Sequence, residues 1–117
     1  MSWKVQAKTP KKRSKYNAKG SYYKEMYFPS KKELKRYQDL EYLERSGEIK
    51  DLKRQVRYKI IEAAGPHKEK FYVADHVYVN CKTGKEVVED VKGVITDVYR
   101  LKRQLMLIVH GIKIKEM

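Results

Sequence analysis

The sequence predicts a small mixed α/β layer structure, with a helix, three strands, a second helix and a last strand in chain order. Apolar residues recur at helical spacing in two segments, and they alternate with polar residues in the segments between and after them. The length of 117 residues suits one ordinary domain, and a hydrophobic content of 41% is enough for one modest core.

The first helix is predicted to begin at Ser30. Pro29 precedes it, and the run Ser30-Lys31-Lys32-Glu33 has the spacing of a capping box. Ser46-Gly47 is a typical helix end. The predicted apolar stripe consists of Leu34, Tyr37, Leu40 and Leu43.

Three strands are predicted after this helix. Residues 52–61 (LKRQVRYKII) form the first, with Val56, Tyr58 and Ile60 on one face, and Gly65-Pro66 marks a turn. Residues 71–80 (FYVADHVYVN) form the second, and residues 82–85 are a hairpin turn that leads to a third at 86–92. Alternation along the second strand predicts one face made of Phe71, Val73, Asp75, Val77 and Val79.

The second helix is predicted over about residues 97–109, with Thr96 or Asp97 as its cap and Gly111 as its stop. Residues 112–116 (IKIKE) alternate like a short final strand. The apolar positions at helical spacing are Val98, Leu101, Leu105 and Ile108.

The positive charge is concentrated at the N-terminus. The net charge is +13, and eight of the 28 basic residues fall within residues 1–24, where no acid occurs. We therefore expect residues 1–21 to be a basic arm that is disordered without a partner, ahead of a single domain at 22–117. Such arms neutralise phosphates and speed association with nucleic acid, and the arm residues expected to do so are Lys11, Lys12, Arg13 and Lys15. A solubilising tail is the alternative.

Several classes of protein are disfavoured. No run of eighteen apolar residues predicts a membrane span, and no apolar stretch follows the N-terminal charges as it would in a secretory signal. Cys81 is the single cysteine, and the three histidines lack ligand spacing for zinc. No glycine-rich loop indicates a nucleotide site. These features suit a reducing, cytoplasmic setting.

Residues 87–93 (VVEDVKG) place charged groups inside an apolar strand. Residues two apart share a face, so Asp90 and Lys92 project together, and Glu89 projects to the other side. Pairing of strands 71–80 and 86–92 across the short turn brings Asp75 to the same point of the sheet. Buried carboxylates need partners.

A divalent cation would compensate two neighbouring carboxylates. Hard oxygen ligands from Asp75 and Asp90, with a backbone carbonyl such as that of Val91 and waters, suit Mg²⁺ or Mn²⁺. Lys92 would then position an attacking water or neutralise a phosphate. The alternative is a buried salt bridge of Lys92 with Asp90 or Asp75, with Glu89 on an exposed face.

The Asp75…Asp90-Val91-Lys92 pattern resembles the signature of the PD-(D/E)xK nuclease superfamily. Three blocks in order, at residues 28–58, 71–79 and 87–106, resemble a family of small phage and prophage proteins within it. The likeness runs from about Tyr23 to the C-terminus and implies a restriction-endonuclease-like core.

The resemblance also implies roles for other residues. Glu33 matches a glutamate on the first helix that joins the metal site, although a capping role also explains it. Gln55 matches a family glutamine that orients a catalytic ligand or closes a hydrogen bond. Basic groups on the second helix would meet the DNA backbone, and they are Arg100, Lys102 and Arg103.

From these residues and this resemblance we expect a Mg²⁺-dependent DNA endonuclease in a bacterial host cell, encoded by a phage or prophage. Branched or recombination DNA is the expected substrate, as for Holliday junction resolvases, and a homodimer is the expected assembly. The alternatives are a non-catalytic nucleic-acid-binding protein and a nuclease-fold subunit that needs a partner protein.

Overall fold

The computed structural model describes residues 20–117. The described residues divide into two compact units, residues 20–34 and residues 35–117. The predicted basic arm falls outside the described residues except for Gly20 and Ser21, of which Ser21 opens a strand. The arm residues predicted to contact nucleic acid, Lys11, Lys12, Arg13 and Lys15, therefore lie outside the described part of the chain.

The first unit contains a hairpin that the sequence did not predict. Strands β2 (Ser21–Tyr23) and β3 (Met26–Phe28) pair in antiparallel fashion. Lys24 and Glu25 form the turn with φ angles of 52° and 66°, a left-handed pair that asparagine and glycine usually supply. This unusual turn chemistry explains why the hairpin gave no signal in the sequence.

Helix α1 (Lys31–Arg45) begins and ends where the sequence predicted. The hydroxyl Oγ of Ser30 accepts a hydrogen bond of 3.2 Å from the amide of Glu33, which satisfies one free donor of the first turn. At the other end Gly47 adopts φ +86°, and its amide donates to the carbonyl of Glu44. The glycine there permits the left-handed conformation that terminates the helix.

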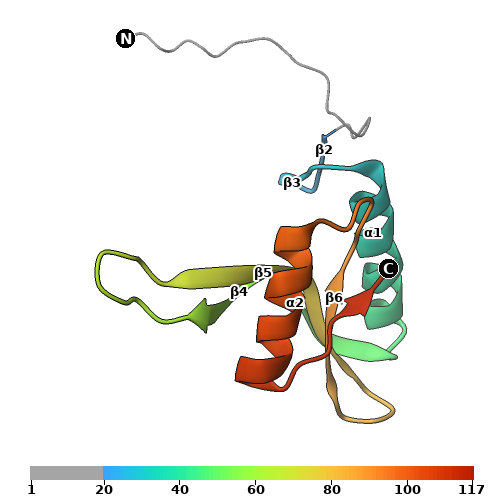
Figure 1. Ribbon diagram of the computed structural model, residues 1–117. Helices are drawn as coiled ribbons and strands as arrows, with labels where there is room; N and C mark the ends of the chain where they lie inside the picture. Colours follow the sequence, from blue (N-terminus) through green and yellow to red (C-terminus); the bar gives the residue numbers. More distant parts are fainter. Residues whose placement is uncertain (1–19) are drawn as a thin grey trace, which may run out of the picture. The chain divides into compact units, whose positions relative to one another are not determined.

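The second unit is built on a four-stranded sheet in the order β4-β5-β6-β7. Its strands are β4 (Ile49–Ile61), β5 (Lys70–Asn80), β6 (Glu86–Asp90) and β7 (Lys115–Glu116). The first three are antiparallel, and β7 runs parallel to β6 (Figure 1). The fold is therefore α+β with a mixed sheet flanked by helices, which confirms the predicted class.

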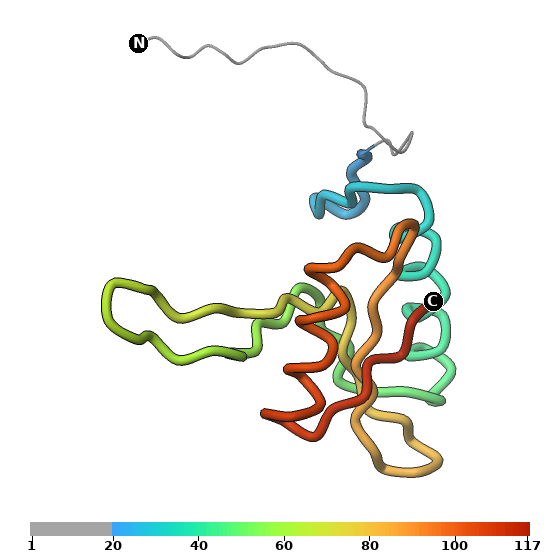
Figure 2. The backbone as a smooth tube through the Cα atoms, viewed as in Figure 1, coloured from blue at the N-terminus to red at the C-terminus, as the bar shows by residue number. Residues whose placement is uncertain are grey.

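The β4–β5 hairpin extends well past the rest of the sheet, as the tube in Figure 2 shows. Gly65 lies in its tip with φ +57°, and Ala64 and His67 exchange backbone hydrogen bonds of 3.0 and 2.9 Å across the turn. The Gly65-Pro66 turn is thus where the sequence placed it.

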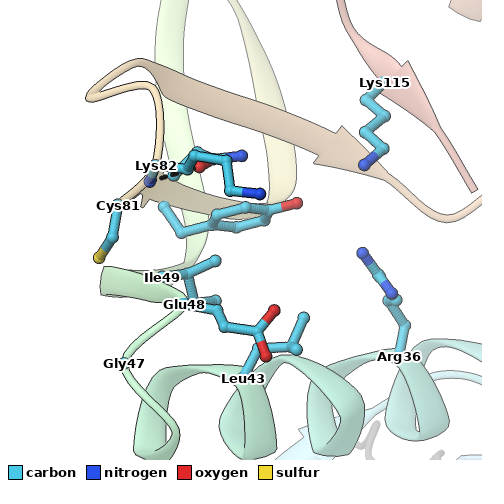
Figure 3. A pocket seen from close by; sticks show the side chains of 10 residues that line it. Arg36, Leu43, Gly47, Glu48, Ile49, Cys81, Lys82 and Lys115 are labelled. Atoms are coloured by element: carbon cyan, nitrogen blue, oxygen red, sulfur yellow. Dashed lines mark hydrogen bonds between the residues drawn. The ribbon is translucent and has the colours of Figure 1, made fainter.

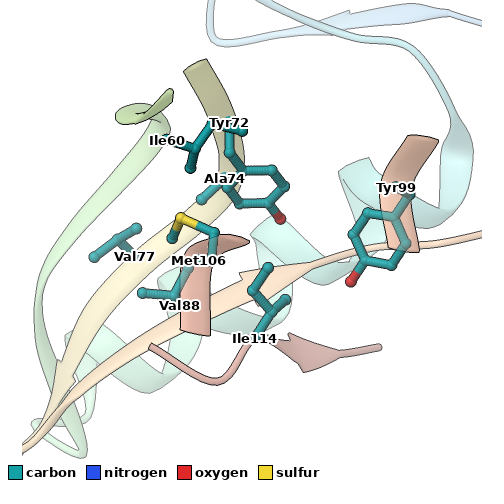
Figure 4. Close-up of a cluster of buried hydrophobic side chains, with 8 residues drawn as sticks. All are labelled: Ile60, Tyr72, Ala74, Val77, Val88, Tyr99, Met106 and Ile114. Carbon is teal, nitrogen blue, oxygen red and sulfur yellow. The ribbon is translucent and has the colours of Figure 1, made fainter. Parts of the chain in front are cut away.

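The two faces of the sheet are covered by different helices. On one face Leu40 of α1 packs against Ile49 and Tyr78. On the other face Met106 of α2 (Asp97–His110) packs in the main core (Figure 4). The remaining buried members of that core are Ile60, Tyr72, Ala74, Val77, Val88, Tyr99 and Ile114.

Helix α2 has the predicted ends. Thr96 is its cap, with Oγ1 accepting from the amide of Tyr99 at 3.1 Å, and Gly111 ends it at φ +67°. Tyr99 and Met106 point inward. Of the four apolar positions at helical spacing, Val98, Leu101 and Ile108 are exposed, and only Leu105 packs against the core, partly buried.

The predicted face of β5 was wrong in its first half. Tyr72 and Ala74 enter the core together with Val77, whereas Val73 is exposed. Alternation is therefore interrupted between Ala74 and Val77. The interruption coincides with a left-handed residue, Gln55 (φ +54°), in the paired strand β4. The register is the same on both sides of Gln55, so we attribute the change of face to the backbone conformation there and not to an inserted residue.

Neighbouring residues of α2 provide a test of its inward face. Met106→Ala should lower the free energy of unfolding by about 2–4 kcal/mol, because the side chain is fully buried. Leu107→Ala, which truncates a 55% exposed side chain next to it, should change that energy by less than about 0.5 kcal/mol. Urea unfolding monitored by circular dichroism measures both. Equal losses would contradict the orientation of α2.

Candidate functional site

The β5–β6 hairpin brings the predicted acids together. The ladder pairs Tyr78 with Val87 and His76 with Glu89, so the next position places Asp75 opposite Asp90 as β6 ends. The turn between the strands has Gly84 at φ +74°. The predicted register of the hairpin is confirmed.

The segment that follows β6 is held from two sides. The carboxylate Oδ2 of Asp75 accepts a hydrogen bond of 2.9 Å from the amide of Val91. The amide of Met117 donates to the carbonyl of Asp90 at 3.0 Å, and the amide of Lys92 donates to the carbonyl of Met117 at 3.4 Å. These bonds fix the backbone from which Asp90 and Lys92 project.

Asp90 is almost completely buried, with 3% of its surface exposed. Its Oδ2 accepts a short hydrogen bond from the hydroxyl of Tyr72 and lies 3.2 Å from Nζ of Lys92. That ammonium also lies 4.1 Å from the centroid of the Tyr99 ring. The carboxylate is therefore compensated inside the protein by one hydroxyl and one cation.

Tyr72 connects the two acids electrostatically. Burial raises the pKa of its hydroxyl, and the hydrogen bond to Asp90 and the negative charges of Asp90 and Asp75 raise it further. The hydroxyl therefore stays protonated and acts as a donor toward Asp90. Its pKa responds to both carboxylates, so all three groups lie in one electrostatic environment.

Gln55 lies across the sheet from Asp75, between the paired residues Arg54–His76 and Val56–Ala74. Its Nε2 donates to Oδ1 of Asp75 at 3.4 Å. A left-handed φ is strained for glutamine and is expected where local structure requires it. The predicted supporting residue therefore does lie beside the first acid.

Two of the three predicted basic residues of α2 are engaged by acids. Nη1 of Arg100 lies 2.8 Å from Oδ1 of Asp97. Nη1 of Arg103 lies 2.5 Å from Oε2 of Glu116, which also accepts from the Tyr99 hydroxyl at 2.7 Å. The bonds from Tyr99 and Arg103 lower the pKa of the Glu116 carboxyl.

Lys102, the third, is half-buried. Contacts of these three residues with DNA stay a prediction.

Glu33 belongs to the other compact unit. It is a buried residue, and its amide is the donor to the Ser30 cap. Its predicted second role, as a metal ligand, stays a prediction.

The site offers two carboxylates and one backbone carbonyl as oxygen ligands for a hard cation. Asp75 and Asp90 are two carboxylates at one end of a hairpin, and the carbonyl of Val91 lies in the segment held between them. Within residues 20–117, no group of three or more His, Cys, Asp and Glu side chains is arranged to hold a metal ion. Mg²⁺ is often bound through one or two carboxylates, with waters and substrate phosphate as its other ligands.

Glu89 corrects one expectation from the sequence. As part of the alternative salt-bridge reading it was expected on an exposed face, and it is fully buried. Nε and Nη2 of Arg36 donate to its two oxygens at 3.0 and 2.6 Å, and the hydroxyl of Tyr78 donates as well. Burial opposes ionisation of Glu89, but these donors outweigh it and keep the carboxyl pKa below its usual value.

His76 lies beside this ion pair and is fully buried. Its Nδ1 is 4.0 Å from Oε1 of Glu89, and its ring stacks on Tyr37 at 5.9 Å. Neither ring nitrogen has a hydrogen-bond partner in the described part of the chain. Burial lowers the pKa of the imidazole to about 4, and Glu89 offsets part of that effect.

A cavity of about 550 Å³ opens on the α1 side of the sheet. Arg36 from α1 and Lys115 from β7 point toward the same space, and Lys82 lies on the turn above it (Figure 3). Cys81 is exposed at its edge. Sequence reasoning did not identify this cavity, because its cations come from three separate elements.

The comparisons with known proteins decide family membership. Residues 13–114 match the model of a family described as "Protein of unknown function (DUF1064)". The chain belongs to the DUF1064 family. The match to DUF1064 covers nearly the whole sequence and begins about ten residues before the likeness described from the motifs. No curated protein and no solved structure is significantly similar to this DUF1064 protein.

Within residues 20–117, no helix has the length and apolar content that crossing a membrane requires.

Sequence reasoning missed the aromatic and cationic partners of the buried acids, namely Tyr72, Tyr78, Tyr99 and Arg36. The Glu89-Asp90 doublet in an apolar run was a usable signal, because a doublet in a strand sends one carboxylate to each face. The doublet therefore predicts one set of hydrogen-bonding or charged partners on each face of the sheet. From the sequence, partners were considered for Asp90 alone.

Removal of Arg36 tests how much the Arg36–Glu89 pair contributes to the free energy of unfolding. Arg36→Met should lower the free energy of unfolding by about 3 kcal/mol, because it leaves a fully buried carboxylate without its cation. Lys35→Met, which removes an exposed pair with Asp39, should cost less than about 0.5 kcal/mol. Chemical denaturation measures both, and similar effects of the two changes would contradict this assignment.

His76 should make stability depend on pH. Its pKa is about 4 in the folded protein and near 6.5 when unfolded, so the unfolded state binds more protons as pH falls between these values. Its contribution is complete above pH 6.5 and is lost toward pH 4. Between about pH 7.5 and 5 the protein should lose about 2 kcal/mol, and His76→Leu should remove most of that loss. An unchanged slope in His76→Leu would contradict this assignment.

Proposed function

We propose that the protein is a divalent-metal-dependent DNA endonuclease that hydrolyses phosphodiester bonds. The observation that carries the proposal is the grouping at the end of the β5–β6 hairpin. Asp75 and Asp90 are the next residues beyond the last ladder pair, His76–Glu89. The Asp75 carboxylate fixes the Val91 amide, and Lys92 lies 3.2 Å from the Asp90 carboxylate. Two carboxylates and a lysine at one point are suited to phosphoryl chemistry.

Asp75, Asp90 and the carbonyl of Val91 would hold Mg²⁺ or Mn²⁺. A role of Glu33 as a further ligand rests on the resemblance alone. When bound, the cation polarises the scissile phosphate and lowers the pKa of water next to it. Within residues 20–117, Tyr72 and Lys92 both contact Asp90 through Oδ2, and Oδ1 would be the oxygen that binds the ion. No nucleotide cofactor is required.

The remaining groups would position the reactants. The Lys92 ammonium, restrained by Asp90 and by the Tyr99 ring, would donate to a phosphate oxygen or to the attacking water. Gln55 would orient the Asp75 carboxylate. Tyr72 would hold Asp90 in one rotamer through its hydroxyl. Each of these roles is exerted through a contact described above.

The net charge of +13 supports a polyanionic substrate. Resemblance to the nuclease superfamily favours branched or recombination DNA, cleaved by a homodimer in the cytoplasm of a phage-infected or lysogenic bacterium. This substrate class rests on the resemblance of motifs, whereas the proposed reaction rests on the arrangement of Asp75, Asp90 and Lys92.

A second function is favoured by a specific observation. Asp75 and Asp90 already have protein partners in Val91, Gln55, Tyr72 and Lys92. A nucleic-acid-binding protein with structural acids would need no metal to explain them.

Cleavage assays separate the two functions. Labelled four-way junctions, linear duplexes and single strands would be incubated with the protein in Mg²⁺, in Mn²⁺ and in EDTA. The proposal predicts cation-dependent cleavage, lowered at least about 100-fold in Asp90→Asn and in Lys92→Met. The DNA dissociation constants of both variants should stay within about threefold of wild type.

Asp39→Asn serves as the matched control, because it removes an exposed carboxylate that pairs with Lys35. It should cleave like wild type. Cleavage that persists in EDTA, or that survives in both site variants, would contradict the proposal. DNA binding without cleavage of any substrate would support the second function.

A further inference from the structure

Helix α2 carries an apolar stripe that is mostly exposed. Val98, Leu101 and Ile108 are 63%, 54% and 67% exposed, and Val109 beside them is 50% exposed. Leu105 completes the stripe and is partly buried against the core, so the stripe borders the core along one edge. The opposite side of the helix already packs on the sheet through Tyr99 and Met106. A helix that is apolar on both sides is expected to be covered on both sides.

The stripe contains no charged residue, although charged residues make up 37% of the chain. At 100° per residue Arg100 and Arg103 lie on another side of the helix, and Asp97 and Lys102 border the stripe. Val94 and Ile95, just before the helix, are exposed too. An uncharged surface does not suit DNA, which is recognised largely through cations on the protein.

The spacing of the stripe is self-complementary. Its residues are separated by three, four and three positions, from Val98 to Leu101, Leu105 and Ile108. Read in reverse the spacing is the same, so an antiparallel second helix would place its Ile108 opposite Val98 and its Leu105 opposite Leu101. We infer that α2 is the contact surface of a symmetric homodimer, in which two copies pack their stripes in antiparallel orientation.

Three consequences follow from the size and charge of this contact. A standard interface buries about 20–30 residues a side, and this stripe offers far fewer, so the dimer should be weak, with a dissociation constant in the micromolar range. Each copy carries +13 charges, so the copies repel each other outside the apolar seam. Added salt screens this repulsion, and dimerisation should therefore strengthen with ionic strength.

This inference does not rest on the proposed nuclease activity. It would stand if the protein cleaved nothing, and the activity would stand in a monomer. The salt dependence also separates it from binding to nucleic acid, which weakens as salt rises.

Analytical ultracentrifugation of the full chain over roughly 1–200 µM tests the inference. The average mass should rise from the monomer value of 14.0 kDa toward about twice that value. Leu101→Glu, which puts a charge at the centre of the seam, should weaken dimerisation at least about tenfold, and Ile108→Lys should do the same. Circular dichroism should show that both variants remain folded, because both side chains are more than half exposed.

Leu107→Glu is the matched control, since Leu107 is 55% exposed on the same helix and, at 100° per residue, lies outside the stripe. It should dimerise like wild type. A chain that stays at the monomer mass across the whole range would overturn the inference, whatever covers the stripe. Equal loss of dimer in Leu101→Glu and Leu107→Glu would overturn it as well.

Discussion

Two successive acids on a buried strand impose the main constraint on this fold. Glu89 and Asp90 are adjacent in β6, so their carboxylates project to opposite faces of the sheet, and 0% and 3% of their surfaces are exposed. Each buried charge requires its own set of donors. Glu89 obtains Arg36 and Tyr78, and Asp90 obtains Tyr72 and Lys92. The packing on both faces of the sheet is organised around these two sets.

The two sets serve different purposes. The Arg36–Glu89 pair bonds through both oxygens, which fastens α1 to the sheet. Together with Tyr78, Arg36 occupies three of about four acceptor positions of the carboxylate. Among the described residues Asp90 is held through Oδ2, beside a second carboxylate and an ammonium. Chemistry is therefore expected on the Asp90 side, and stability on the Glu89 side.

The sequence predicted the elements of this fold better than their faces. Ser30, Thr96, Gly47 and Gly111 mark helix ends through local hydrogen bonds and backbone conformation, which depend on few residues. The face of α2 could not be predicted the same way. The helix is apolar on two sides, and the pattern does not say that Tyr99 and Met106, rather than Leu101 and Ile108, face the sheet.

The positions of the candidate site residues were likewise predictable where local sequence fixes them, and not where tertiary packing does. Asp75, Asp90 and Lys92 were predictable because strand alternation and a short turn fix their register. Tyr72 was not, because the left-handed Gln55 interrupts the alternation of the ladder and β5 is buried on both faces over its second half. Arg36 was not, because its partner lies 53 positions away in the sequence. Such pairings depend on tertiary packing and leave no local pattern.

The claim that Asp90, and not Glu89, forms the chemical site is tested most directly by divalent-ion linkage. Thermal unfolding would be followed with and without Mn²⁺, at matched ionic strength, in wild type, Asp90→Asn and Glu89→Gln. At tenfold excess over its dissociation constant the ion should stabilise wild type by about 1.4 kcal/mol. Glu89→Gln should be less stable but keep this increment, and Asp90→Asn should lose it. An increment that survives in Asp90→Asn and disappears in Glu89→Gln would contradict the account.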